Sequence, residues 1–121
     1  MSFAAMAGGK TRVDPNHSSA REAALEAMKH VNQQANSMHY KRLVQVHSAH
    51  SQVVAGTKWY LDISFVSTNC KKADMDLSQS QDLSEQQCPA RNDASVERCQ
   101  IELWVKPWEN FSQITKMQCT A

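Results

Sequence analysis

Four cysteines and five histidines are the side chains of this sequence that could do chemistry. Such residues can pair as disulfides, gather around one zinc ion, or supply a nucleophilic thiol with a histidine as its base. The cysteines all lie in the C-terminal half, and the histidines lie in the N-terminal half without a ligand-like spacing. These residues are Cys70, Cys88, Cys99 and Cys119, and His17, His30, His39, His47 and His50.

The spacing of the cysteines favours disulfides over the two alternatives. Cys99 and Cys119 each lie ten residues from Glu109, which falls in a predicted turn, so an antiparallel hairpin would place them opposite each other. Cys70 and Cys88 then remain to close a polar segment. No Cys-x-x-Cys pair favours zinc, and four paired thiols leave no nucleophile. We therefore expect two disulfides, no metal, no cofactor and no catalytic residue.

Composition argues against several classes of partner. Thirteen Lys and Arg stand against twelve Asp and Glu, and the net charge of +1 favours neither nucleic acid nor an anionic membrane. No apolar run approaches the roughly 18 residues of a membrane-spanning helix. Hydrophobic residues make up 41% of the 121 residues, which suits one modest core. We expect a single domain over residues 1–121.

The cysteines also indicate an oxidising compartment, and hence a secreted, extracellular protein. The apolar start over residues 1–9 is too short for the core of a signal peptide, and no Lys or Arg precedes it. We interpret the chain as a mature or recombinant form that lacks its signal peptide. Two glycosylation sequons, Asn16-His17-Ser18 and Asn110-Phe111-Ser112, agree weakly with secretion.

One helix is predicted over residues 19–35. Ser19 and Glu22 fit a capping box at its start. Apolar residues recur at three- and four-residue spacing, and most of them are small, which suits a helix lying close against a sheet. This stripe consists of Ala20, Ala23, Ala24, Ala27, Met28, Val31 and Ala35.

Alternating apolar residues predict two hairpins, so we expect an α+β domain. The first hairpin joins residues 40–49 and 58–67, and the second joins residues 96–105 and 111–119. In the expected register Val44 faces Phe65, and Val46 faces Ile63. Residues 1–9 are interpreted as a flexible arm and residues 70–95 as an irregular surface excursion.

Both predicted turns carry apolar side chains, although turns normally face water. Val53 and Val54 stand at the first turn, and Trp108 follows Pro107 at the second. Two interpretations remain open. The three side chains either pack against one another or the core, or they form a binding edge together with the N-terminal arm.

These features together resemble the secreted type 2 cystatins over residues 6–121. Residues 52–56 match the family's Q-x-V-x-G loop, Pro107-Trp108 matches its Pro-Trp pair, and Gly8 or the adjacent Gly9 matches its N-terminal glycine. The resemblance implies a five-stranded antiparallel sheet wrapped around one long helix, with a first strand near residues 10–13. It also implies the disulfides Cys70–Cys88 and Cys99–Cys119.

The resemblance implies reversible, competitive and tight-binding inhibition of papain-like cysteine proteases such as cathepsins. The inhibitor would block the active-site cleft with a wedge of three segments and would perform no chemistry, so the protein would not be an enzyme. The wedge comprises the arm residues Met6, Ala7, Gly8 and Gly9, the loop residues Gln52, Val53, Val54, Ala55 and Gly56, and the turn residues Pro107 and Trp108.

A second inhibitory site is implied after the helix. In some type 2 cystatins an Asn in this loop inhibits asparaginyl endopeptidases of the legumain type. Asn36 stands at that position and Ser37 follows it, whereas Ala35 departs from the family pattern. The alternative is an Asn that merely terminates the helix.

Two other possibilities concern the whole molecule. Domain swapping would straighten the first loop and destroy the wedge, so we expect the inhibitory form to be a monomer. The alternative function is a cystatin-fold secreted protein with a non-inhibitory, immunomodulatory or receptor-binding role.

Overall fold

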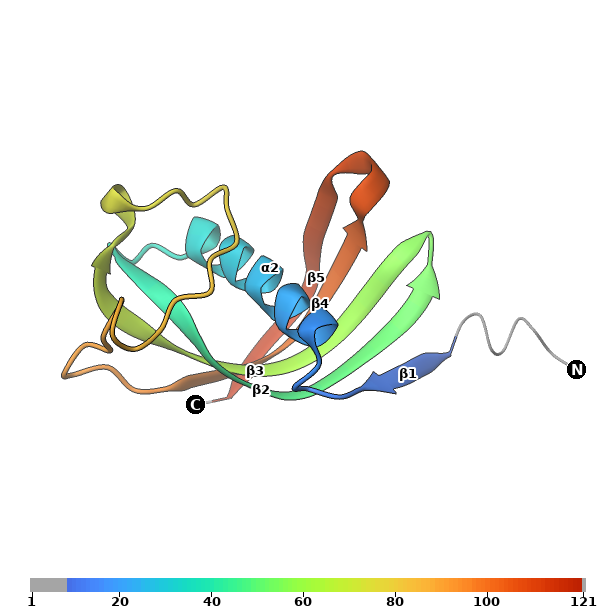
Figure 1. The fold of residues 1–121 in the computed structure, drawn as a ribbon, viewed down its shortest axis with the longest axis horizontal. Helices are drawn as coiled ribbons and strands as arrows, with labels where there is room; N and C mark the ends of the chain where they lie inside the picture. The colour runs from blue at the N-terminus through green and yellow to red at the C-terminus, as the bar shows by residue number, and fades with distance from the viewer. Residues whose placement is uncertain (1–8, 121) are drawn as a thin grey trace, which may run out of the picture.

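The computed structural model describes residues 9–120, in which an antiparallel sheet curves around one α-helix (Figure 1). The sheet order follows the chain order, β1-β2-β3-β4-β5. The predicted α+β fold is therefore confirmed, including the short first strand. The elements are β1 (Lys10–Val13), α2 (Ser18–Gln34), β2 (His39–Val54), β3 (Gly56–Lys71), the 3-10 turn η1 (Lys72–Asp74), β4 (Glu97–Lys106), the 3-10 turn η2 (Pro107–Glu109) and β5 (Phe111–Thr120).

The start of α2 differs from the predicted capping box. The N-cap residue is His17, whose Nδ1 accepts a hydrogen bond of 3.1 Å from the Ser19 backbone N–H. Ser19 therefore lies in the first turn and cannot cap it, so this detail of the prediction is wrong. A ring nitrogen of His17 takes the place of the usual hydroxyl or carboxylate acceptor at this position.

The core lies between α2 and the concave face of the sheet. The helix contributes the buried small side chains Ala20, Ala24 and Ala27, which let its backbone approach the strands closely. The strands contribute larger side chains that alternate with outward polar residues, as the periodicity predicts. The buried strand residues of this core are Leu43, Val46, Ala49, Leu61, Ile63, Phe65, Cys99, Ile101 and Leu103.

The register of the first hairpin is only partly as expected. Val46 pairs with Ile63, as predicted, but Leu43 rather than Val44 pairs with Phe65. A bulge between Leu43 and Gln45 leaves Val44 exposed. One extra residue on a strand reverses the face of the sheet on which the following side chains lie. The expected pair between Val44 and Phe65 is therefore wrong.

The polar excursion is attached to the rest of the fold by a disulfide, a hydrogen bond and an ion pair. The Cys70–Cys88 disulfide closes the excursion, and the Arg42 Nε donates a hydrogen bond of 2.9 Å to the Cys88 carbonyl. Within the excursion, Asp82 forms an ion pair of 2.6 Å with Arg21 of α2. The second predicted disulfide, Cys99–Cys119, joins residues that face each other on β4 and β5. Both predicted pairings are formed.

Candidate functional site

Three segments that are far apart in the sequence meet at one end of the sheet. Lys10 at the start of β1 pairs with Gln52 near the end of β2, and Thr57 at the start of β3 pairs with Val105 near the end of β4. The first tip (Gln52–Gly56) and the second tip (Lys106–Asn110) therefore project from the same end (Figure 1). The predicted loop residues and the Pro-Trp pair are thus brought together.

The apolar side chains at the two tips face solvent. Val53 is 68% exposed, Val54 is 40% exposed and Trp108 is 67% exposed. Ala55 and Pro107 are exposed as well. Burial of these side chains in the core is therefore excluded, and both tips present exposed apolar side chains to a partner.

The first tip reverses direction within one residue, which the five-residue loop of the prediction did not anticipate. β2 runs to Val54 and β3 begins at Gly56, so only Ala55 stands between them. Gly56 has φ +91°, and a Cβ there would lie 2.3 Å from the Val105 carbonyl oxygen. Glycine thus permits both the tight turn and the close approach of the second hairpin.

Trp104 joins the two tips, although the sequence analysis did not identify it. Its Nε1 donates a hydrogen bond of 2.7 Å to the Ala55 carbonyl. Its ring meets the Phe111 ring edge to face at 5.5 Å, and the Lys106 Nζ lies 4.6 Å from the centroid of each ring. An outward-facing Trp near the end of a predicted strand was the only signal that could have revealed this contact.

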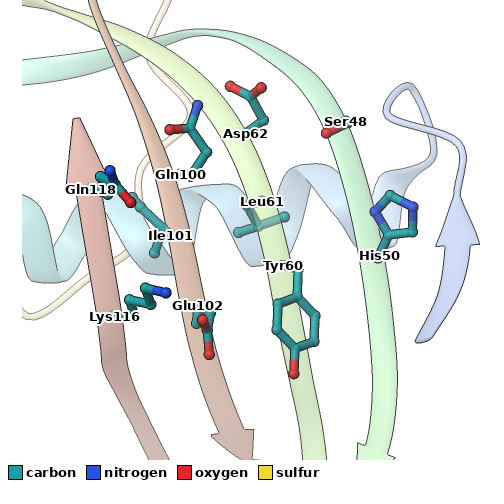
Figure 2. Close-up of a pocket in the computed structure, with 10 residues that line it drawn as sticks. All are labelled: Ser48, His50, Tyr60, Leu61, Asp62, Gln100, Ile101, Glu102, Lys116 and Gln118. Carbon is teal, nitrogen blue, oxygen red and sulfur yellow. The ribbon is translucent and has the colours of Figure 1, made fainter. Parts of the chain in front are cut away.

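A second contact fixes the base of the first tip from the outer face of the sheet. The Tyr60 hydroxyl donates a hydrogen bond of 2.6 Å to Gln52 Oε1, and the Lys10 Nζ lies 3.8 Å from the centroid of the Tyr60 ring. Figure 2 shows Tyr60 on this face beside a shallow depression that is lined mostly by polar residues, with α2 behind the strands. Asp62 lines this depression, and the hydrogen bond from Arg98 on β4 lowers the pKa of Asp62.

The second tip is braced from behind by a carboxylate on α2. Glu26 accepts hydrogen bonds from Ser112 of β5 and from Ser80 of the excursion, and the Lys29 Nζ lies 2.6 Å away. Burial acts to raise the pKa of Glu26, but the hydrogen bonds from Lys29, Ser112 and Ser80 outweigh it and hold that pKa below its usual range. His30 lies 2.7 Å from the Ser112 hydroxyl, and burial lowers its pKa.

The described residues contain neither a free thiol nor a metal-holding cluster. All four cysteines are in disulfides, and residues 9–120 contain no group of three or more His, Cys, Asp or Glu placed to hold a metal ion. The one α-helix within that range is neither long enough nor apolar enough to cross a membrane. Contact with a partner is the chemistry that the exposed tips support.

Known proteins resemble this chain in sequence. A profile of the cystatin domain matches residues 8–108. Cystatin-1 of Crotalus adamanteus is 32% identical over 116 residues, which cover 96% of this chain and 84% of that protein. The chain belongs to the cystatin family. Cystatin-C of Bos taurus is 30% identical over 115 residues, which cover 93% of this chain and 72% of that protein.

Solved structures agree with this assignment. The salivary cystatin of the soft tick Ornithodoros moubata superposes with a TM-score of 0.72 at 27% identity, covering 94% of this chain and 98% of that one. The expected family and the cystatin fold are therefore confirmed. Cystatins are generally cysteine protease inhibitors that bind papain-like proteases, and they are not enzymes.

The N-terminal part of the expected cystatin wedge is only partly described. Met6, Ala7 and Gly8 lie outside the described residues. Gly9 is exposed and directly precedes Lys10, which pairs with Gln52 of the first tip. The described chain therefore starts beside that tip.

The predicted second site of the cystatin lies at the opposite end of the sheet. Asn36 is exposed between α2 and β2, and Ser37 Oγ accepts a hydrogen bond from the His39 N–H. Lys72 holds both flanks of this loop, because its Nζ donates 2.7 Å to the Ala35 carbonyl and its N–H donates 2.9 Å to the Met38 carbonyl. The loop is thus anchored while Asn36 faces solvent.

Proposed function

We propose that this cystatin is a reversible, competitive, tight-binding inhibitor of papain-like cysteine proteases, cathepsins among them. The observation that supports this most strongly is the juxtaposition of two exposed apolar tips with the start of the described chain. The protein would act as a secreted, extracellular monomer whose single domain spans residues 1–121. Intact, exposed tips favour inhibition over the alternative immunomodulatory or receptor-binding role.

The proposed mechanism is obstruction of the active-site cleft. Val53 and Val54 would fill the centre of the cleft, Trp108 would bury its ring on the primed side, and Met6 to Gly9 would follow the non-primed side. The close contact of Gly56 with Val105 and the bond from Trp104 to Ala55 hold the two tips together. A preorganised surface loses little entropy on binding, which favours high affinity.

Two charge substitutions at exposed valines test this proposal. Val54→Asp places a carboxylate at the first tip, so we expect papain inhibition to be lost while the circular dichroism spectrum is unchanged. Val96→Asp is the matched control, since Val96 is 60% exposed and lies just before β4, at the other end of that strand from the tips. Equal inhibition constants for Val54→Asp and the wild-type protein would contradict the wedge.

We propose a second inhibitory site for legumain-type asparaginyl endopeptidases at Asn36 and Ser37. The exposed amide of Asn36 on an anchored loop supports it, because such enzymes recognise an Asn side chain. Asn36→Lys should remove legumain inhibition and leave papain inhibition intact. Retained legumain inhibition by this variant would refute the site, whereas loss of both activities would point to a folding defect.

A further inference from the structure

Asn110, at the second tip, lies in the sequon Asn110-Phe111-Ser112 and is open to modification. It is exposed and adopts the left-handed conformation, with φ 51°, directly after η2. Its backbone N–H is bonded to the Pro107 carbonyl at 3.0 Å. Its side-chain amide makes no hydrogen bond to any other residue within 9–120, so the amide nitrogen is available.

The surroundings of Asn110 suit a sugar. The residue lines a mainly polar groove between the second tip, α2 and residues 78–80 of the excursion. Hydroxyl, amide and charged groups in this groove, among them Ser78, Gln79 and Lys29, are the kind of group that hydrogen-bonds carbohydrate. A bulky glycan therefore leaves the folded chain through polar surface and displaces no apolar core.

We propose that Asn110 is a site of N-linked glycosylation and that its glycan weakens binding of the second tip to papain-like proteases. The weakening rests on the proposed inhibitory function. Asn110 is two residues from Trp108, which is 67% exposed and carries the largest apolar side chain of the second tip. A glycan at this point competes for the space that the protease must occupy around that ring.

The modification is a group transfer in the secretory pathway from a lipid-pyrophosphate-linked oligosaccharide. The bond between the first sugar's C1 and the pyrophosphate breaks, and C1 bonds to Asn110 Nδ2. The amide proton passes to a base of the transferring enzyme, and the lipid pyrophosphate leaves. In the folded chain the Ser112 hydroxyl, which the sequon requires, is held by Glu26 and His30. The transfer therefore precedes closure of the second hairpin onto α2.

The second sequon provides an internal control. Asn16 is exposed just before α2 and lines a groove with Val44, Gln45 and Val46 of β2. Val46 is eight residues from Val54 along that strand, which corresponds to roughly 25 Å. A glycan on Asn16 therefore lies away from both tips and should leave protease binding unchanged.

The test compares glycoforms of the full chain secreted from a eukaryotic host. Peptide mass spectrometry reports occupancy of Asn110, and papain inhibition constants are measured before and after glycan release by an amidase, which leaves Asp at the site. Asn110→Asp is the matched variant and Asn16→Asp is the control. We expect the glycan on Asn110 to raise the inhibition constant at least tenfold, and release or Asn110→Asp to abolish that increase.

Each other outcome is decisive. An unmodified Asn110 in the secreted protein overturns the proposed site. A modified Asn110 with equal inhibition constants before and after release overturns the weakening. Failure of the unglycosylated protein to inhibit papain contradicts the proposed inhibitory function instead, while occupancy is still decided by mass.

Discussion

Trp108 illustrates at the residue scale how side-chain type determines the proposed function. A Trp residue that is 67% exposed adds little to the stability of the free molecule, but it can bury a large apolar area in a complex. The backbone of η2 presents this ring, and Asn110 ends the turn in the left-handed conformation. We therefore expect the binding contribution of the second tip to be concentrated in this one side chain.

Replacing Trp108 with Ala should weaken papain binding by about 2 kcal/mol, or roughly thirtyfold in the inhibition constant. The reason is the loss of the ring's buried area in the complex, while the free protein keeps its stability. Inhibition kinetics and thermal unfolding measure the two quantities. Val96→Ala serves as the control, and an unchanged inhibition constant for Trp108→Ala would contradict a role for the second tip.

The sequence predicted which residues stand at the two exposed tips, and for a physical reason it missed other residues that hold the tips. Residues 52–56 and Pro107-Trp108 are recognisable because the signal is contiguous in the chain. Trp104 is not recognisable in this way, because its bond to the Ala55 carbonyl depends on where two hairpins meet. The capping role of His17 was missed because Ser19 and Glu22 offered a more familiar pattern.

At the scale of elements, the two hairpins act as one unit because side chains connect them. Trp104→Phe removes the hydrogen bond to Ala55 and retains a ring that can pack on Phe111. We expect papain binding to weaken by about 1 kcal/mol, or roughly fivefold, because the first tip loses its tether. The circular dichroism spectrum should not change. Binding as tight as that of the wild-type protein would show that the tether is unnecessary.

The brace behind the second tip predicts a pH dependence. Burial lowers the pKa of His30 below its ordinary 6.5, so below that value the unfolded chain binds the proton more readily. The stabilising contribution of neutral His30 is therefore present above pH 6.5 and is lost as pH falls toward its folded pKa. Glu26, whose pKa is also lowered, adds a further loss at more acidic pH.

Denaturant unfolding at about pH 7.5 and about pH 5.5 should reveal this loss. The free energy of unfolding of the wild-type protein should fall more between the two conditions than that of His30→Gln, which cannot take up a proton. An equal fall in the free energy of unfolding of the two proteins would show that groups other than His30 cause the acid sensitivity.

The sequence predicted which long elements form, because alternation and helical spacing extend over many residues, but it placed the facing ends of the first hairpin too far apart: strands predicted at 40–49 and 58–67 are observed at His39–Val54 and Gly56–Lys71. Strands predicted at 96–105 and 111–119 are observed at Glu97–Lys106 and Phe111–Thr120. The bulge beside Val44 was not predictable, because the alternation of apolar and polar residues in the sequence does not show where a strand gains an extra residue. The short strand β1 carries too few residues for a period and emerged only from the family resemblance.

At the scale of the whole molecule, the Cys70–Cys88 bridge and the tips proposed to bind protease lie at opposite ends of the sheet. The Cys70–Cys88 bridge lies near the end of β3, whereas Gly56 at the start of that strand belongs to the first tip. The double replacement Cys70→Ala and Cys88→Ala should lower the free energy of unfolding by about 3 kcal/mol.

The same double variant should inhibit papain as the wild-type protein does at temperatures where it remains folded. This separation follows because the bridge does not contact the tips. Urea unfolding and inhibition kinetics on one preparation measure both effects. A large loss of affinity in a folded variant would show that the excursion supports the binding edge from a distance.

The central claim is that the apolar tips occlude the cleft of a papain-like protease, and active-site titration of papain tests it most directly. The oxidised monomer should abolish activity at a one-to-one ratio, competitively with substrate, and activity should return on dilution or displacement. Residual activity that is independent of inhibitor concentration, or inhibition that does not compete with substrate, would contradict the wedge.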